Sequence, residues 1–236
     1  MAFLTNLLGV ILNALVEVTG SYGLAIIGMA LVVMLITFPL NLRQMQFSFK
    51  MKLIAPKIEE IKKKYKDPDK VNEETLALWK EHGINPAAGC FPLLIQFPII
   101  IAMFNVLRQP GIFSSAPSFL GLSLVLPDAE QTFWMLIRQN PGYLVVPILA
   151  VATTVFQQRQ MSQGSEQDAA AMRSMNLFLP VLMGYISISY PTALGLYWVS
   201  RNVFTIIQYY LVTRMLERKY SLEEGVQLDA KRRKAR

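Results

Sequence analysis

The side chain with the most unusual chemistry in this sequence is Arg201. It is a permanent cation inside the apolar run "LGLYWVSRNVFTIIQYYLV", residues 194–212. An arginine at the centre of a bilayer costs between about 3 and more than 10 kcal/mol, depending on the method. A charge at this depth almost always faces the interior of a helix bundle or a water-filled cavity. The alternative is that its side chain extends outward to the headgroups or bonds a backbone carbonyl, with only a structural role.

Residue types that carry catalysis are scarce in this chain. There is one cysteine, Cys90, so an intramolecular disulfide and a cysteine-based metal cluster are excluded. The only histidine, His82, lies outside the apolar runs, and no acidic residue lies within one. A membrane-embedded hydrolase is therefore poorly supported, and we expect no enzyme activity, no metal site and no cofactor.

Long uncharged segments surround Arg201 in the sequence. The chain is 53% hydrophobic, yet its formal net charge is +7, because the charges are concentrated between the apolar runs. About 20 apolar residues cross a bilayer as a helix. We predict an all-α membrane protein, a five-transmembrane-helix bundle whose fourth span is short, about 24 Å of helix. The five spans are roughly 23–42, 90–107, 142–158, 175–190 and 194–213, the last two joined at "SYPT" by Pro191.

Lysines and arginines in the connecting segments predict the orientation. Residues 43–82 hold ten of them and the tail from Arg214 onward holds eight, whereas residues 109–141 hold only Arg138. This distribution places the N-terminus outside and the C-terminus inside. The predicted cytoplasmic segments are residues 43–89, the loop 159–174 and the tail 214–236. The loop 109–141 is predicted to be extracytoplasmic, as an irregular loop or a re-entrant hairpin, because its apolar part is too short to span.

The N-terminal segment, residues 1–22, has a helical apolar period. Leu4, Leu8, Ile11, Leu15 and Val18 share one face of a helix. This pattern predicts an amphipathic helix lying in the outer interface ahead of the first span. The alternative is that these residues merely lengthen that span.

The segment 43–89 predicts a helical hairpin that projects into the cytoplasm. Met51, Ile54, Ile58, Ile61 and Tyr65 follow the narrow seam of a coiled coil. After this seam, Asp67 is a candidate helix cap with Pro68 at the first helical position, and a second helix carrying Leu76 and Trp79 ends near Gly83. The hairpin is either a plain solvated face or a docking surface for a protein or for lipid headgroups, with the candidate contacts Lys62, Lys63 and Lys64.

Residues 82–107, "HGINPAAGCFPLLIQFPIIIAMFNVL", resemble the signature of the YidC family of membrane protein insertases. The resemblance extends to "FPLNLRQMQFSFKM" after the first span, "TTVFQQ" in the third and "GLYWVSRNVFTIIQ" in the last. It implies a five-span, non-enzymatic protein of the bacterial plasma membrane. Such a protein receives nascent membrane proteins in a hydrophilic groove that is open to the cytoplasm and closed on the outer side.

The same resemblance identifies candidate groove residues. Family members carry a groove arginine on the first span, about five residues before a Phe-Pro pair, but this chain has Met34 there. Trp198 matches a groove position, and Arg201, three residues later, shares its helix face. We therefore hypothesise that the groove charge has moved from the first span to the last, at a depth about 6 Å from that of Met34. Gln158 and Gln96 complete the candidate set. The other polar residues at membrane depth line the groove or bond between helices: Asn105, Thr153, Thr154, Gln157, Ser187, Asn202 and Gln208.

The basic tail "DAKRRKAR" is a second candidate docking segment, through Lys231, Arg232, Arg233 and Lys234. It suits ribosomal RNA or anionic lipid, and a simple topology anchor explains it equally well. The expected partners are nascent membrane proteins and anionic lipids, with the ribosome and the Sec translocon as candidates and no role for DNA. The rival function is a small transporter or channel with an intramembrane arginine, although internal repeats typical of transporters are not evident.

Overall fold

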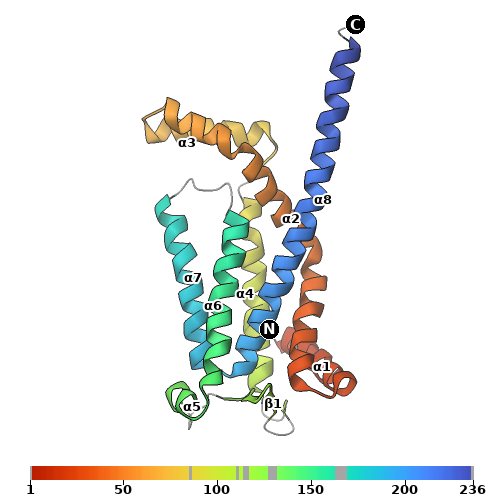
Figure 1. The fold of residues 1–236 in the computed structure, drawn as a ribbon, viewed down its shortest axis with the longest axis vertical. Coiled ribbons are helices and arrows are strands. Elements are labelled where there is room, and N and C mark those ends of the chain that lie inside the picture. The colour runs from red at the N-terminus through yellow and green to blue at the C-terminus, as the bar shows by residue number, and fades with distance from the viewer. Residues whose placement is uncertain are drawn as a thin grey trace.

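The computed structural model describes residues 2–84, 87–109, 112–113, 117–126, 132–162 and 169–234, and their side chains within 2–84, 97–109, 112–113, 117–126, 132–161 and 177–220. This part of the chain is almost entirely helical (Figure 1). In chain order, the elements are α1 (Ala2–Thr19), α2 (Tyr22–Lys64), α3 (Pro68–Glu81), α4 (Ala87–Arg108), β1 (Ser118–Phe119), β2 (Leu122–Ser123), α5 (Phe133–Gln139), the 3-10 turn η1 (Pro141–Leu144), α6 (Val145–Ser162), α7 (Ala169–Ser189) and α8 (Thr192–Lys234).

The helices α2, α4, α6, α7 and α8 run side by side as a bundle (Figure 1). The helix α8 packs most extensively against α2 and α6, and less so against α7 and α4. The helix α1 packs on α2 and α4. We call the two ends of the bundle the α3 end and the α1 end; the latter also carries α5 and the β1–β2 hairpin (Figure 1).

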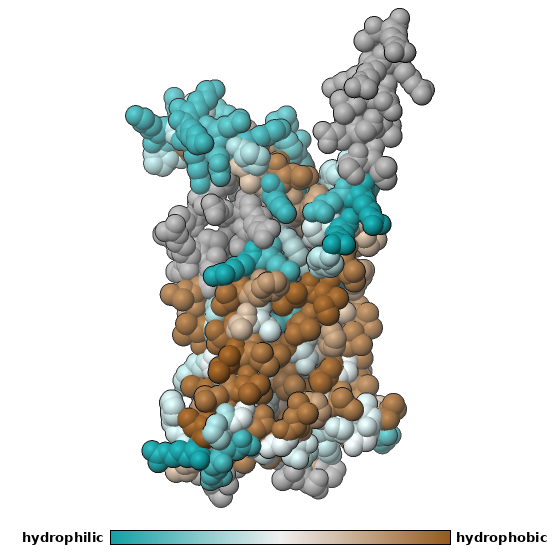
Figure 2. Space-filling view, viewed as in Figure 1, coloured by the Kyte–Doolittle hydropathy of each residue, from teal (hydrophilic) through white to brown (hydrophobic). Residues whose placement is uncertain are grey.

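The middle of the bundle is apolar on its surface. Figure 2 shows a hydrophobic band between two ends that carry hydrophilic residues. Within the described residues, α1, α2 and the segment Pro141–Met161 are long and apolar enough to cross a membrane, and Phe97–Arg108 and Leu177–Ser189 are shorter apolar helices. The helix α8 does not reach that level of apolarity, since Arg201, Asn202 and Gln208 interrupt its apolar run. The fourth predicted span, residues 175–190, is part of a longer helix. The helix α7 has 21 residues and begins before this span.

The N-terminal helix is a separate element. It ends at Thr19, Gly20 adopts a φ of 64°, and α2 begins at Tyr22. The alternative that residues 1–22 lengthen the first span is therefore wrong, because a left-handed residue at that point turns the chain. The side of α1 away from the bundle carries exposed apolar residues: Phe3 is 80% exposed and Val18 is 84% exposed.

The helix α2 continues without a break from the bundle into the predicted hairpin. It has 43 residues and includes Pro39 and Pro56. Beyond the bundle its buried seam of Met51, Ile54 and Ile58 packs with Ile84, Leu78 and Trp79, so that α3 folds back on α2. Asp67 caps α3, because its Oδ1 accepts a hydrogen bond from the Asp69 amide at 3.2 Å. Leu76, by contrast, is exposed, and Thr75 is the buried residue at that turn.

The predicted loop 109–141 contains structure that the sequence analysis did not identify. Ser118 pairs with Ser123 and Phe119 with Leu122 in a two-stranded antiparallel hairpin. Its turn is Leu120–Gly121, with φ of 52° and 78°. Two consecutive positive φ values match the twist of a tight hairpin. The fold is therefore helical with one small β element, not purely α.

Candidate functional site

The side chain of Trp198 is held between α8 and α6. Its Nε1 donates a hydrogen bond to the Thr154 Oγ1 at 2.9 Å. Four residues further along α8, the Nδ2 of the buried Asn202 donates to the Thr153 Oγ1 at 3.0 Å and to the Thr154 Oγ1 at 2.9 Å. These bonds fix the face of α8 that carries Trp198 and Asn202 against α6, inside the apolar band of the bundle.

A second polar contact fixes α8 against α2. The Asn41 Nδ2 donates to the Gln208 Oε1 at 3.4 Å and to the Thr37 Oγ1 at 3.3 Å. Met34 lies seven residues before Asn41, and Arg201 lies seven residues before Gln208. Both helices run from the α1 end to the α3 end (Figure 1). Seven residues are almost two full helical turns, so Met34 and Arg201 lie at the same level and on corresponding faces.

Arg201 is half-buried, and it lies in a row of polar atoms that lack partners. Its Nε is buried without a hydrogen-bond partner among the described residues, and the same holds for the Tyr197 Oη, the Asn202 Oδ1 and the Gln208 Nε2. All four belong to three consecutive turns of α8. A buried polar group without a partner costs several kcal/mol in an apolar medium. Such a row is typical of a site that water or a polar ligand enters.

Towards the α1 end, the space beside Trp198 is narrow. It is a cavity of about 20 Å³ between α4, α7 and α8. Its lining includes Ile100, Met183, Ser187, Tyr197 and Trp198. This volume holds about one water molecule. The cavity lies on the α1 side of Arg201, and its lining is mainly apolar.

Towards the α3 end, the helices α2, α6 and α8 converge. Met45, Tyr209 and Val212 form a buried cluster with Met161 packed against it. The Ser48 Oγ donates to the Met161 carbonyl at 2.7 Å, which satisfies one of the last carbonyls of α6. Arg201 thus lies between a narrow cavity on one side and an apolar contact on the other.

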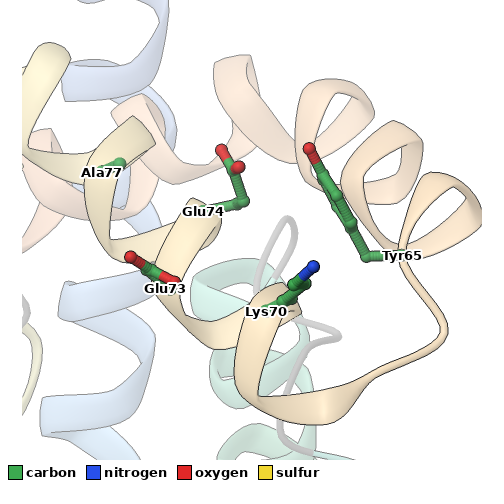
Figure 3. A pocket seen from close by; sticks show the side chains of 5 residues that line it. All are labelled: Tyr65, Lys70, Glu73, Glu74 and Ala77. Atoms are coloured by element: carbon green, nitrogen blue, oxygen red, sulfur yellow. The ribbon is translucent and has the colours of Figure 1, made fainter.

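A larger pocket than this cavity lies elsewhere, on the hairpin. Figure 3 shows Tyr65, Lys70, Glu73, Glu74 and Ala77 around an open hollow of about 310 Å³ between the end of α2 and the start of α3. Acidic and basic side chains both line this pocket, and none of its lining residues belongs to α8. It is a feature of the hairpin surface and not a part of the polar row on α8.

The family model of the 60Kd inner membrane protein matches residues 14–219. The chain belongs to this family. A relative from Caldanaerobacter subterraneus subsp. tengcongensis, "Membrane protein insertase YidC", is 37% identical over 217 residues, which cover 91% of this chain and 96% of that protein. "Membrane protein insertase MisCA" of Bacillus subtilis is 34% identical over 202 residues, covering 83% of this chain and 72% of that one.

A solved structure of the family is also similar. The chain matches "Active YidC insertase crystal structure with the first transmembrane domain resolved" with a TM-score of 0.62 and 28% identity. The match covers 89% of this chain but only 45% of that one, so this chain spans less than half of the solved protein. The predicted resemblance to the YidC family is confirmed by these relatives.

The structure brings together part of the set of groove residues predicted from the family. Trp198 and Arg201 lie on adjacent turns of α8, and Met34 lies level with Arg201; all three are half-buried, as is Gln158 on α6. The side chain of Gln96 lies outside the described residues. Among the other polar candidates, Thr153, Thr154, Asn202 and Gln208 bond between helices.

The two predicted docking segments lie at the α3 end. Lys62, Lys63 and Lys64 form the exposed last turn of α2. The side chains of Lys231, Arg232, Arg233 and Lys234 lie outside the described residues. The sequence did not single out Tyr197 as a member of the polar row, nor Thr37 and Asn41 as the polar residues of α2 beside it. The sequence signal for this contact between α2 and α8 was the equal spacing of seven residues from Met34 to Asn41 and from Arg201 to Gln208.

Proposed function

We propose that this protein is a membrane protein insertase. It takes the polar end of a nascent membrane protein into a hydrophilic groove along α8, and it releases the apolar segment of that client into the bilayer. Membership of the 60Kd inner membrane protein family and relatives named as insertases support the activity. The observation that carries the groove is the row of buried, unpartnered polar atoms around Arg201.

The physical reason for such a groove is the cost of moving a polar chain through hydrocarbon. The bilayer core is about 30 Å thick, and every unpaired polar group of the client costs several kcal/mol inside it. Polar side chains of α8 and water between the helices offer partners part of the way across. The apolar segment of the client needs no such help, because lipid solvates it.

In the proposed orientation, α2, α4, α6, α7 and α8 span a bacterial plasma membrane. The α3 end lies in the cytoplasm and the α1 end lies outside, with α1 in the outer interface. The cationic segments support this arrangement, since Lys62, Lys63 and Lys64 are at the α3 end and cytoplasmic segments carry the excess of lysine and arginine. The small cavity beside Trp198 then lies on the outer side of Arg201.

Within the groove, Arg201 supplies the charge that relatives carry on the first span. The common level and face of Met34 and Arg201 support this assignment, because a guanidinium on either helix reaches the same space. Gln158 on α6 is a further lining residue. The hairpin α2–α3 and the basic tail dock a cytoplasmic partner, for which anionic lipid, the ribosome and the Sec translocon are the candidates.

The rival reading, a small transporter or channel with an intramembrane arginine, has less support. The cavity beside Trp198 measures about 20 Å³, which is room for about one water molecule and not for a larger solute. The named relatives are insertases and not transporters.

Site-specific crosslinking to a ribosome-bound nascent membrane protein tests the proposal. A photoreactive residue is placed at Trp198, at Arg201 or at Met34, and the matched control is Ile207, an exposed residue on the opposite face of α8. We expect crosslinks to the client from the first three positions, with those from Arg201 and Met34 at its polar end, and few from Ile207. Equal crosslinking from all four positions, or crosslinks to small solutes alone, would contradict an insertase groove.

A further inference from the structure

The hydroxyl of Thr154 has all of its hydrogen-bonding capacity in use. It donates its proton to the Ala150 carbonyl at 2.7 Å. Its oxygen accepts from the Trp198 Nε1 at 2.9 Å and from the Asn202 Nδ2 at 2.9 Å. A threonine hydroxyl has one donor and two acceptor sites, so this one is saturated. It joins two α8 side chains to the backbone of α6 through a single atom.

The neighbouring Thr153 has a smaller share in this network. Its hydroxyl proton goes to the Leu149 carbonyl at 2.6 Å, and its oxygen accepts from Asn202 but not from Trp198. Both threonine protons are therefore committed to backbone carbonyls. Asn202 can therefore bond the two threonine hydroxyls only as a donor, through its NH₂ group. Its Oδ1 is buried without a hydrogen-bond partner among the described residues.

The bond from Trp198 determines which part of the indole ring meets a client. The single N–H donor of the ring points to α6, whereas the ring also lines the narrow cavity with Ile100, Met183 and Tyr197. With its donor occupied, the indole presents only carbon and its π face to that side. The wall at Trp198 is thus apolar, although Arg201 lies within one turn of it.

We infer that Thr154 is a positioning residue for Trp198 and that it sets the client chemistry at this level of the groove. By occupying the indole donor it makes Trp198 a contact for the apolar segment of a client, while the polar end is held at the level of Arg201. Without the Thr154 hydroxyl, the indole is free to turn. Its N–H is then available to bind the polar end of the client, and Trp198 no longer selects the apolar segment. This inference rests on the proposed insertase function.

The first experiment measures the hydrogen bond without any client. The protein carries Trp79→Phe and Trp134→Phe, so that Trp198 is the only tryptophan, and its indole N–H resonance is recorded by NMR in lipid nanodiscs. Thr154→Val should move this resonance and speed its exchange with solvent, whereas Thr154→Ser keeps the hydroxyl and should leave it near its original position. The matched control Thr153→Val should also leave it in place. A resonance that Thr154→Val does not move, or that Thr153→Val moves equally, would overturn the inference.

The second experiment asks whether the hydrogen bond acts on insertion through Trp198. Thr154→Val should lower insertion of an apolar client several-fold, and Thr154→Ser should restore it. In a Trp198→Phe background, which has no indole donor, the effect of Thr154→Val should be less than half as large, because the two residues act as a pair. Equal effects in both backgrounds, or full insertion by Thr154→Val, would show that Thr154 only holds the helices together.

The two experiments separate this inference from the proposed function. The NMR measurement contains no client, so its result does not depend on insertase activity. If the crosslinks to Trp198 described above fail while the resonance behaves as expected, the insertase groove is wrong and the hydrogen bond remains. If the crosslinks form and the double-mutant effects are additive, the groove stands and the positioning role of Thr154 is wrong.

Discussion

Arg201 combines two features that seldom occur together in a membrane helix. Its Nε is buried without a partner in the described part of the chain, and polar side chains flank it on the same helix. Charged side chains within membrane spans almost always face the bundle interior or a water-filled cavity. Arg201 lies in such a bundle, level with Met34, where the family resemblance predicts a cation. We expect this charge to lower the stability of the bundle and to serve the proposed insertion.

Removing this charge should therefore change stability and insertion in opposite directions. Arg201→Met replaces the guanidinium by an apolar side chain of similar length. We expect unchanged or higher thermal stability, with a gain of up to about 3 kcal/mol because a desolvated cation is lost. We expect insertion of a client with an acidic polar end to fall several-fold.

Adding Met34→Arg to this variant should recover much of the insertion, since both positions reach the same space. The measurements are unfolding in detergent micelles and insertion into vesicles by the purified protein. The matched control is Met34→Leu, which adds no charge. The relocation of the groove charge would be wrong if Arg201→Met inserted like the parent, or if the rescue by Met34→Arg were no greater than that by Met34→Leu.

At the residue scale, the conspicuous members of the site were predictable and the ordinary ones were not. A charge inside an apolar run stands out, and Trp198 followed from the family resemblance. Thr37 and Asn41 did not, because short polar residues in spans most often bond between helices. The depth of Arg201 was also predictable only approximately. Counting from the span ends put it about four residues from the level of Met34, whereas the contact between Asn41 and Gln208 puts the two level.

At the scale of elements, the β1–β2 hairpin fastens the α1 end of the bundle. The first two amides of α8 bond to the residues that follow β2, from the Thr192 N to the Leu126 carbonyl at 2.8 Å and from the Ala193 N to the Leu124 carbonyl at 3.0 Å. These bonds satisfy helix amides that have no partner within α8. The Ser123 N donates to the Tyr143 hydroxyl at 2.8 Å, which connects the hairpin to the start of α6. The hairpin and the residues after it thus connect α6 and α8 at the α1 end of the bundle.

The contact between this hairpin and α2 depends on a glycine. A Cβ on Gly23 would overlap the ring of Phe119. Gly23→Ala should therefore displace the hairpin and lower the stability by about 1–3 kcal/mol, as overpacking does. The measurement is thermal unfolding in detergent micelles.

The matched control for this prediction lies in the same helix. A Cβ on Gly28 would meet the Leu15 side chain at 3.5 Å, an ordinary contact. Gly28→Ala should be neutral or slightly stabilising, since alanine is the better helix former. Equal losses from the two substitutions would mean that Phe119 does not depend on Gly23 in the membrane protein.

The long helices were predictable from uncharged runs, and the hairpin was not. Each strand has only two residues, and its place is determined by contacts with residues distant in sequence, such as Tyr143 and Leu126. The turn also contains Leu120 at a φ of 52°, a conformation that favours glycine or asparagine. A turn residue of this kind gives no signal in the sequence.

At the scale of the whole molecule, the two ends of the bundle differ in charge and in packing. The exposed last turn of α2 at the α3 end carries Lys62, Lys63 and Lys64, whereas α5 at the α1 end exposes Trp134 and Met135. Tryptophan is enriched at membrane interfaces, where its ring lies among the headgroups. The charge difference favours a cytoplasmic α3 end, and the aromatic residue favours an α1 end close to the membrane surface.

Labelling with a membrane-impermeant maleimide tests this orientation directly. In a Cys90→Ser background, Lys63→Cys and Trp134→Cys each place one exposed thiol at one end of the molecule. We expect Trp134→Cys to react in intact cells whose outer barrier has been removed, and Lys63→Cys to react only in inverted vesicles. Both should react after detergent is added, which controls for accessibility. Lys63→Cys labelling in intact cells would place the α3 end outside. The groove would then open away from the ribosome, and co-translational insertion from the cytoplasm would be impossible for this chain.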